Sequence, residues 1–277
     1  IWKPSSKAAL SAVAAMKLIW PVLKSNDLPD GILNLVVGSG PSIGEAMIHD
    51  RRIPLVSATG SVRMGRQVAA AVGARLGRTI LELGGNNAVI VSPSADLDLA
   101  VRAVVFGAIG TAGQRCTTIR RVLVHADSFD GFCASLVRSY QQLRVGNPLE
   151  EGVHMGPLVD SAAVNAMQAA LKQLKDQGGK ILCGGQVLSG GIFDAGTYVT
   201  PCIAEARADM PIVHEETFAP ILYAIRYRTM EEAVANLNAV PQGLSSAIFT
   251  NHLVEAETFL SAGGSDCGIA NVNTGTS

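Results

Sequence analysis

Two residues of this 277-residue chain have the types and surroundings that covalent thiol chemistry needs. Cys116 follows a run of small residues (Gly110, Ala112 and Gly113) and Gln114, which leaves room for a substrate against the backbone, and Glu82 stands shortly before the glycine pair Gly84-Gly85. A thiolate attacks a carbonyl carbon, and a carboxylate supported by close-packed glycine backbone activates the water that releases the resulting thioester. No histidine stands close to Cys116, so a Cys-His protease is the weaker interpretation.

Around these two residues the chain resembles the aldehyde dehydrogenase family. In that family a glutamate before two glycines supplies the base, and a glycine-glutamine-x-cysteine segment supplies the nucleophile, so the resemblance implies these roles for Glu82 and Cys116. Further segments, in the same order and at similar spacing, resemble the family's cofactor-binding segments: Trp2-Lys3-Pro4-Ser5, Thr59-Gly60-Ser61 and Glu215-Glu216-Thr217-Phe218-Ala219-Pro220.

The resemblance implies a nicotinamide cofactor and specific residues that hold it. Lys3 would bind the adenine ribose, Gly60 and Ser61 the pyrophosphate, Glu216 the nicotinamide ribose, and Phe218 the nicotinamide ring. Many relatives place a glutamate three positions after the lysine, where this chain has Ser6. NAD is the expected cofactor, and the missing carboxylate leaves NADP open because repulsion of a 2′-phosphate is also removed.

A narrower resemblance concerns the substrate. Four segments are similar to the antiquitin branch, the α-aminoadipic semialdehyde dehydrogenases: Gly84-Gly85-Asn86-Asn87, Arg115-Cys116-Thr117-Thr118, Glu216 to Pro220 and Gly264-Ser265-Asp266-Cys267-Gly268. The branch oxidises a semialdehyde of lysine catabolism to a carboxylate through a thiohemiacetal and a thioester on the cysteine. Arg115 would bind the carboxylate of an amino-acid head group in two parallel hydrogen bonds.

Plainer interpretations of the same residues stay open. Glu82 could cap a turn, Ser61 could be an ordinary helix N-cap, and Arg115 could belong to a structural ion pair. Two other functions also stay open. One is a coenzyme A-acylating enzyme, which the presence of Glu82 disfavours, and the other is a protein of this fold with a non-catalytic structural or binding role.

Composition limits the class of ligand. The chain is 48% apolar and 16% charged with a net charge of −1, and its Lys and Arg residues are dispersed, so we expect a small-molecule substrate, with neither nucleic acid nor a membrane as partner. Five cysteines without a C-x-x-C pair favour a reducing compartment over disulfides or a metal site. The most apolar stretches, 8–23 and 99–109, are interrupted by charged residues or proline and predict no membrane span. A cytoplasmic location is expected, and a mitochondrial leader before Ile1 stays open.

The hydrophobic pattern predicts alternating strands and helices. The fold class is α/β and aldehyde dehydrogenase-like, with a partial Rossmann-type parallel sheet in residues 1–85 (the later part of a coenzyme-binding domain) and a second α/β catalytic domain in 86–277. Helices are predicted at 7–25, 43–49, 62–76, 96–111, 127–143, 160–177, 230–238 and 254–262. Strands are predicted at 33–37, 54–57, 79–83, 88–91, 122–125, 180–183, 221–226, 247–250 and 268–272.

Family members are considerably longer than this chain. The resemblance implies an amino-terminal segment before Ile1 that carries the oxyanion-hole asparagine, and an aldehyde-anchoring loop and oligomerisation strand after Ser277. We therefore expect the 277-residue chain by itself to have low or no activity, and the full-length protein to be a homo-oligomer, either a dimer or a tetramer.

Overall fold

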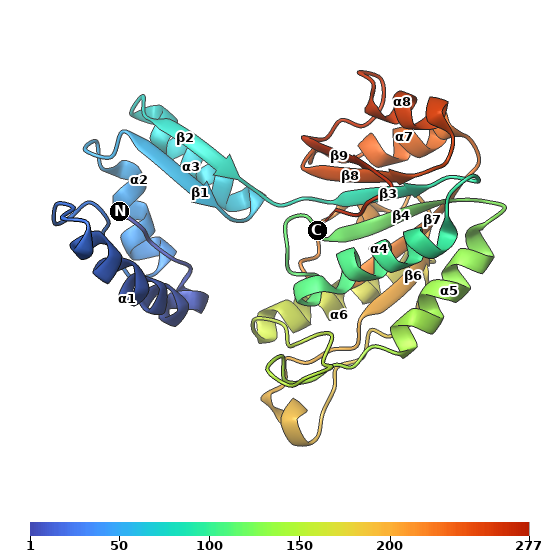
Figure 1. The fold of residues 1–277 in the computed structure, drawn as a ribbon, viewed down its shortest axis with the longest axis horizontal. Helices are drawn as coiled ribbons and strands as arrows, with labels where there is room; N and C mark the ends of the chain where they lie inside the picture. The colour runs from blue at the N-terminus through green and yellow to red at the C-terminus, as the bar shows by residue number, and fades with distance from the viewer. Residues whose placement is uncertain (277) are drawn as a thin grey trace. The chain divides into compact units, whose positions relative to one another are not determined.

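The computed structural model describes residues 1–276, and Ser277, the last residue of the second predicted domain, lies outside the described residues. The chain forms two compact units that meet in sequence between Leu83 and Gly84 (Figure 1). Each unit contains its own parallel strands and its own apolar core.

The first unit is built on a β-α-β element. Its two strands pair in parallel, with Thr59 opposite Glu82, and the helix that connects them buries Val68 and Val72 against Ile48. The elements are α1 (Ala9–Ser25, after a 3-10 turn at Ser6–Ala8), α2 (Glu45–His49, after a π turn at Gly40–Gly44), β1 (Leu55–Thr59), α3 (Val62–Ala74) and β2 (Arg78–Glu82).

Two expectations about the first unit are wrong. The predicted strand at 33–37 is reduced to one parallel bridge between Trp2 and Leu35.

The prediction that the first apolar stretch is too interrupted for a membrane span also fails, because the helix from Ser6 to Ser25 is long and apolar enough by length and composition. The core helix of a soluble protein or a signal sequence passes the same test, so this finding is weak support for a span. Only 11% of the helix window is buried within this chain.

The second unit is a seven-stranded sheet in the order β5-β6-β7-β4-β3-β8-β9, parallel except for the antiparallel pair β5 and β6. Its strands are β3 (Asn87–Val91), β4 (Ile119–His125), β5 (Lys180–Cys183), β6 (Cys202–Ala206), β7 (Ile221–Tyr227), β8 (Ser245–Phe249) and β9 (Ile269–Val272). Its helices are α4 (Leu97–Ile109), α5 (Phe129–Gln141), α6 (Ser161–Asp176), α7 (Met230–Asn238) and α8 (Leu253–Leu260).

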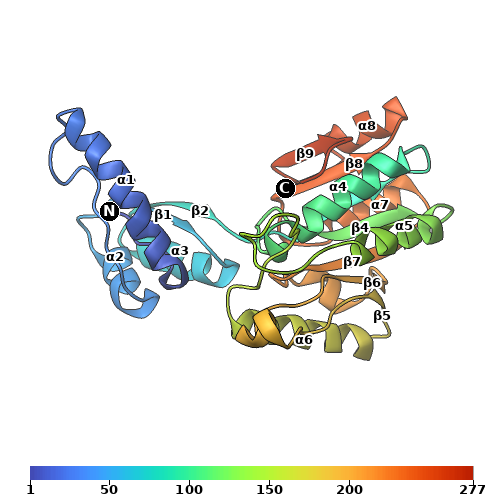
Figure 2. The ribbon, with the colours of Figure 1, turned by 60° about the horizontal axis from the view of Figure 1, so that its bottom comes forward.

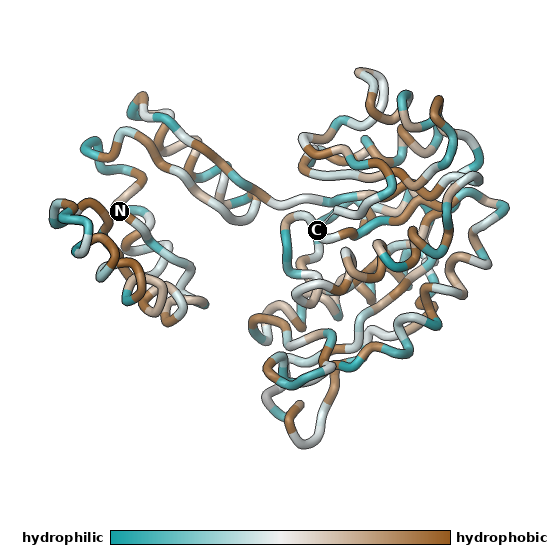
Figure 3. The backbone as a smooth tube through the Cα atoms, viewed as in Figure 1, coloured by the Kyte–Doolittle hydropathy of each residue, from teal (hydrophilic) through white to brown (hydrophobic). Residues whose placement is uncertain are grey.

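Helices cover both faces of this sheet (Figures 1 and 2). The crossover from β3 through α4 moves along the sheet to β4, and the crossover from β7 through α7 moves in the opposite direction to β8. Right-handed crossovers that move in opposite directions place their helices on opposite faces. The central strands are therefore buried on both sides, which explains the apolar runs at residues 88–91 of β3 and 247–249 of β8 (Figure 3).

The sequence missed β6, whose residues Cys202–Ala206 read CIAEA. Alanine and glutamate are depleted in strands, so local composition gave no signal. Burial between β5 and β7 overrides that preference. For the site, the useful result is that β3, β4 and β8 run parallel, so that Asn87, Ile119 and Ser245 begin their strands at one edge of the sheet.

Candidate active site

Cys116 lies on the short connection between the 3-10 turn at Gly110–Gly113 and β4, and its side chain is exposed. The backbone before it is unusual, because Thr111 and Ala112 have φ values of 54° and 53° and Gly113 has 70°. A left-handed conformation costs a non-glycine residue about 1–3 kcal/mol, so surrounding contacts must hold this turn. A Cβ at Gly113 would lie 2.5 Å from the backbone of Ala219, so only glycine fits there.

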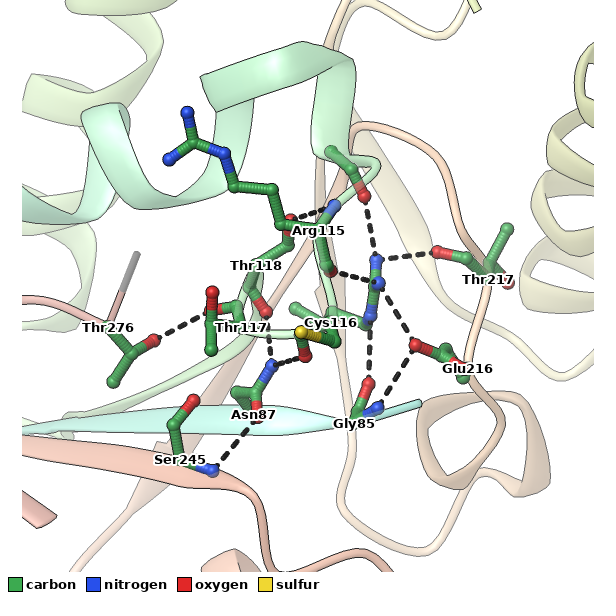
Figure 4. Close-up of polar contacts among 12 residues, drawn as sticks. Gly85, Asn87, Arg115, Cys116, Thr117, Thr118, Glu216, Thr217, Ser245 and Thr276 are labelled. Carbon is green, nitrogen blue, oxygen red and sulfur yellow. Dashed lines mark hydrogen bonds and ion pairs between the residues drawn. The ribbon is translucent and has the colours of Figure 1, made fainter. Parts of the chain in front are cut away.

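Asn87 holds the backbone of the connection that carries Cys116. Its buried amide donates from Nδ2 to the carbonyl oxygens of Cys116 (2.7 Å) and Thr118 (2.8 Å), and its Oδ1 accepts from the N–H of Ser245 at 3.2 Å (Figure 4). One amide thus joins the starts of three neighbouring strands. An unpaired buried polar group costs about 1–3 kcal/mol, so these three contacts strongly favour a single position of the Cys116 backbone. In the sequence, Asn87 stands out only as part of the branch signature, and no local pattern indicates its structural role.

Arg120 holds the connection from the other side, and sequence reasoning missed it. It is the second residue of β4, its side chain is 2% exposed, and its guanidinium makes five hydrogen bonds. Nε donates to Gly85 O (3.0 Å), Nη1 to Gly113 O (3.1 Å) and Thr217 O (2.8 Å), and Nη2 to Arg115 O (3.0 Å) and Glu216 Oε1 (3.2 Å). Burial lowers the pKa of this guanidinium, and the Glu216 carboxylate raises it. The available signal was an arginine pair inside an otherwise apolar strand.

Glu216 and Phe218, both predicted to bind the cofactor, lie next to the Arg120 guanidinium. Glu216 Oε1 accepts from the backbone N–H of Gly85 at 3.1 Å as well as from Arg120, and its side chain is 15% exposed. The Phe218 ring centroid is 5.1 Å from the Arg120 guanidinium carbon, within the range of a cation–π contact. The structure therefore brings Gly85, Glu216, Phe218 and the Cys116 connection around one buried cation.

Arg115, the predicted substrate-binding residue, is directed elsewhere in this structure. Its Nε donates to Thr111 Oγ1 at 2.8 Å, and its backbone N–H donates to Thr118 Oγ1 at 3.1 Å. Figure 4 shows its side chain leading away from the Cys116 sulfur. Its role toward a substrate carboxylate stays a prediction.

The other predicted residues belong to the first unit. Glu82 ends β2 with an exposed side chain, and its carbonyl accepts from the N–H of Gly60 at 3.0 Å. Ser61 accepts from the N–H of Met64 at 3.2 Å, which confirms it as the N-cap of α3. The ammonium of Lys3 donates to the carbonyl of Pro4 at 2.8 Å.

The junction of β1 and α3 in the first unit suits a phosphate or pyrophosphate group. Helix α3 begins directly after the carboxyl end of a parallel strand, the place where open α/β sheets bind phosphate groups. The first-turn N–H groups of a thirteen-residue helix and its dipole favour a pyrophosphate there. In the described part of the chain, no group of three or more His, Cys, Asp or Glu residues could hold a metal ion.

Differences in exposure predict which thiol reacts first. Burial raises the pKa of the Cys133 and Cys202 thiols to about 12, whereas the Cys116 side chain is exposed. Because the thiolate is the reactive species, iodoacetamide at pH 8 should modify Cys116 well before those two residues. Peptide mass spectrometry after a time course measures the order. The urea-unfolded protein is the control, in which all three thiols should react at similar rates. Equal alkylation rates of Cys116, Cys133 and Cys202 in the folded protein would contradict the prediction.

The sequence model of the aldehyde dehydrogenase family matches residues 1–277. Alpha-aminoadipic semialdehyde dehydrogenase from Mus musculus is 46% identical over 278 residues, covering 100% of this chain and 51% of the relative. Betaine aldehyde dehydrogenase from Staphylococcus aureus, solved with NAD⁺, has a TM-score of 0.93 at 27% identity and covers 99% of this chain and 54% of that one. Glyceraldehyde-3-phosphate dehydrogenase GapN from Methanocaldococcus jannaschii, solved with NADP, has a TM-score of 0.91 at 33% identity, with coverages of 99% and 57%.

The chain spans about half the length of the curated relatives it matches. The solved structures confirm the predicted α/β, aldehyde dehydrogenase-like fold class, and the curated relatives confirm the resemblance on which the sequence analysis relied. With a match over its whole length, this chain belongs to the aldehyde dehydrogenase family.

Proposed function

We propose that the protein oxidises an aldehyde to a carboxylate with a nicotinamide cofactor, with Cys116 as nucleophile and Glu82 as base. The observation that supports this most strongly is an exposed thiol on a backbone that Asn87 and Arg120 hold in place. Such a fixed nucleophile suits attack on a carbonyl carbon.

The proposed reaction has two stages at the same sulfur. The Cys116 thiolate attacks the aldehyde carbon, and the backbone N–H of Cys116 helps to stabilise the oxyanion of the thiohemiacetal. A nicotinamide cofactor, which Glu216 and Phe218 would hold, would supply the hydride acceptor that converts the thiohemiacetal into a thioester on Cys116. Glu82 then takes a proton from water, the water oxygen attacks the thioester carbon, and the products are a carboxylate and the free thiol.

Five residues are proposed to hold the cofactor. Lys3, Gly60 and Ser61 serve the adenosine and pyrophosphate, and Glu216 and Phe218 serve the nicotinamide half. The family relatives solved with NAD⁺ and with NADP support a nicotinamide cofactor, and we propose NAD as the preferred one. Because Ser6 leaves the NADP alternative open, rates with both cofactors at equal concentration are the direct measurement.

We further propose a semialdehyde with an amino-acid head group, such as α-aminoadipic semialdehyde, as the substrate. The name of the relative from Mus musculus supports this class. The test is an assay of the natural polypeptide that carries this sequence, with semialdehyde and cofactor, and with identification of the product by mass spectrometry. A free carboxylate supports the proposal, a coenzyme A thioester supports the acylating alternative, and cofactor binding without turnover supports a non-catalytic role.

Arg115 gives a test of substrate choice. Arg115→Ala should raise the KM for the amino-acid semialdehyde far more than the KM for a simple aliphatic aldehyde. Loss of a desolvated charge-assisted pair typically costs about 2–5 kcal/mol, and the aliphatic substrate never makes that pair. Steady-state kinetics with both substrates measure the ratio, and Arg102→Ala, which removes an exposed arginine of α4, is the control. Equal effects on both substrates would refute the role of Arg115.

Three further proposals concern the whole protein. We propose that residues 1–85 belong to its coenzyme-binding domain and residues 86–277 to its catalytic domain. We also propose that it is a homo-oligomer, a dimer or tetramer, in the cytoplasm. Light scattering of the natural protein and fractionation of its cells measure these two properties.

A further inference from the structure

We propose that Arg120 is a positioning residue that fixes Glu216 and the Cys116 connection relative to each other. This inference rests on the proposed function, because it uses the proposed roles of Glu216 toward the nicotinamide ribose and of Cys116 as nucleophile. In this proposal Arg120 contacts neither the cofactor nor the aldehyde, and it acts by holding Glu216 and the Cys116 backbone.

The shape of the guanidinium is what this role requires. Its five donor contacts go to three stretches of chain, at Gly85, at Gly113 to Arg115, and at Glu216 and Thr217. A guanidinium is a rigid planar fork with five N–H donors, whereas a lysine ammonium has three donors on a flexible stem. Lysine at position 120 would keep the charge and lose the geometry.

The contact with Glu216 separates this residue from a purely structural arginine. An anionic partner stabilises a buried cation, and Glu216 provides one at 3.2 Å. In return, Arg120 Nη2 and Gly85 N–H fix Oε1 of the carboxylate from two directions. The same Nη2 also donates to Arg115 O, one residue before Cys116. A shift of this guanidinium would therefore move the carboxylate and the nucleophile backbone together.

The next residue provides a matched control within the same strand. Arg121 is also 2% exposed, and it makes four hydrogen bonds, two to Asn86 O and one each to Asn236 O and Leu237 O. These acceptors are all backbone carbonyls, two of them at the end of α7, and burial lowers the pKa of its guanidinium to about 10. Arg120→Lys and Arg121→Lys therefore disturb equally buried positions, but only the first touches Glu216 and the Cys116 connection.

The experiment compares these variants in the natural polypeptide by calorimetric binding of NAD⁺ and of AMP. AMP lacks the nicotinamide ribose that Glu216 is proposed to contact. Arg120→Lys should weaken NAD⁺ binding about tenfold, the scale of one hydrogen bond to a charged group, and leave AMP binding nearly unchanged. It should also change the rate at which iodoacetamide alkylates Cys116.

The control variant Arg121→Lys should lower the melting temperature and affect the binding of NAD⁺ and of AMP to the same extent. Identical profiles for the two variants would overturn the proposal.

Two more variants extend the test: Glu216→Gln tests additivity with Arg120→Lys, and Gly84→Ala keeps the test informative if Arg120→Lys does not fold. Glu216→Gln should weaken NAD⁺ binding, and adding Arg120→Lys should weaken it little further, because residues that act through one contact are not additive. Gly84→Ala leaves Arg120 intact, but its new Cβ would overlap the Glu216 carboxylate and displace it. It should reproduce the selective loss of NAD⁺ over AMP, and unchanged NAD⁺ binding in Gly84→Ala would overturn the proposal.

Failure of the proposed function gives a different pattern. If the wild-type protein binds NAD⁺ and oxidises no aldehyde, the proposed function is wrong, and the binding and alkylation differences still decide the role of Arg120. If it binds no nicotinamide cofactor at all, both proposals are wrong.

Discussion

Replacing Cys116 with alanine should reduce aldehyde oxidation by at least about 10³-fold, because no other described thiol is held at the start of β4 to form the thioester. Cofactor binding should stay close to the wild-type value, since the cofactor residues proposed here do not include the sulfur. The measurements are steady-state turnover in the natural polypeptide and NAD⁺ binding by calorimetry.

Cys267→Ala is the control for this prediction, since it removes a half-buried thiol from another loop of the same unit. That variant should keep most of its turnover. Turnover at the wild-type rate in Cys116→Ala would show that another residue is the nucleophile.

Glu82→Gln should slow release of the product far more than it slows formation of the thioester. A general base contributes about 10²–10⁴-fold to the step that it assists, and the amide cannot accept the proton of the attacking water. The expected time course is a burst of reduced cofactor, equal in amount to the enzyme, followed by a steady state slower by about that factor. Stopped-flow absorbance of the reduced cofactor measures both phases.

A matched substitution is Glu45→Gln, which neutralises another exposed carboxylate in the first unit. It should leave both phases unchanged. If Glu82→Gln instead lowers the burst and the steady state equally, the carboxylate serves to position the substrate and does not activate water.

The sequence predicted most of the fold for a clear physical reason. Parallel strands buried on both faces contain apolar runs, such as residues 88–91 of β3 and 247–249 of β8, and this pattern is visible in the sequence alone. Prediction failed where the strand propensity of a segment disagrees with the pairing and burial that the folded sheet gives it. Strand β6 has weak strand residues and is buried by its two neighbours, and residues 33–37 have strand character but find only the partner Trp2.

The candidate site shows a similar division. The roles of Cys116 and Glu82 came from motifs that are short in sequence, and they stay predictions. What the motifs did not show is how the chain holds them, because arginine is rarely buried and Arg120 has the residue type of a surface position. The positive φ angles of Thr111 and Ala112 were equally invisible, since neither residue is a glycine.

The contacts around Cys116 also determine when this site exists during folding. They join residues far apart in the chain, with sequence separations of 31 for Asn87 to Thr118, 131 for Gly85 to Glu216, 158 for Asn87 to Ser245 and 159 for Thr117 to Thr276. Such high contact order requires loop closure before any contact stabilises the chain, which makes folding slow. A ribosome that has just added residue 116 has made the Cys116 thiol, but most of the residues that surround it are not yet synthesised. The left-handed turn before the thiol is therefore expected to order late, together with the closing of β8 onto β3, and alkylation of Cys116 would report the completion of the sheet.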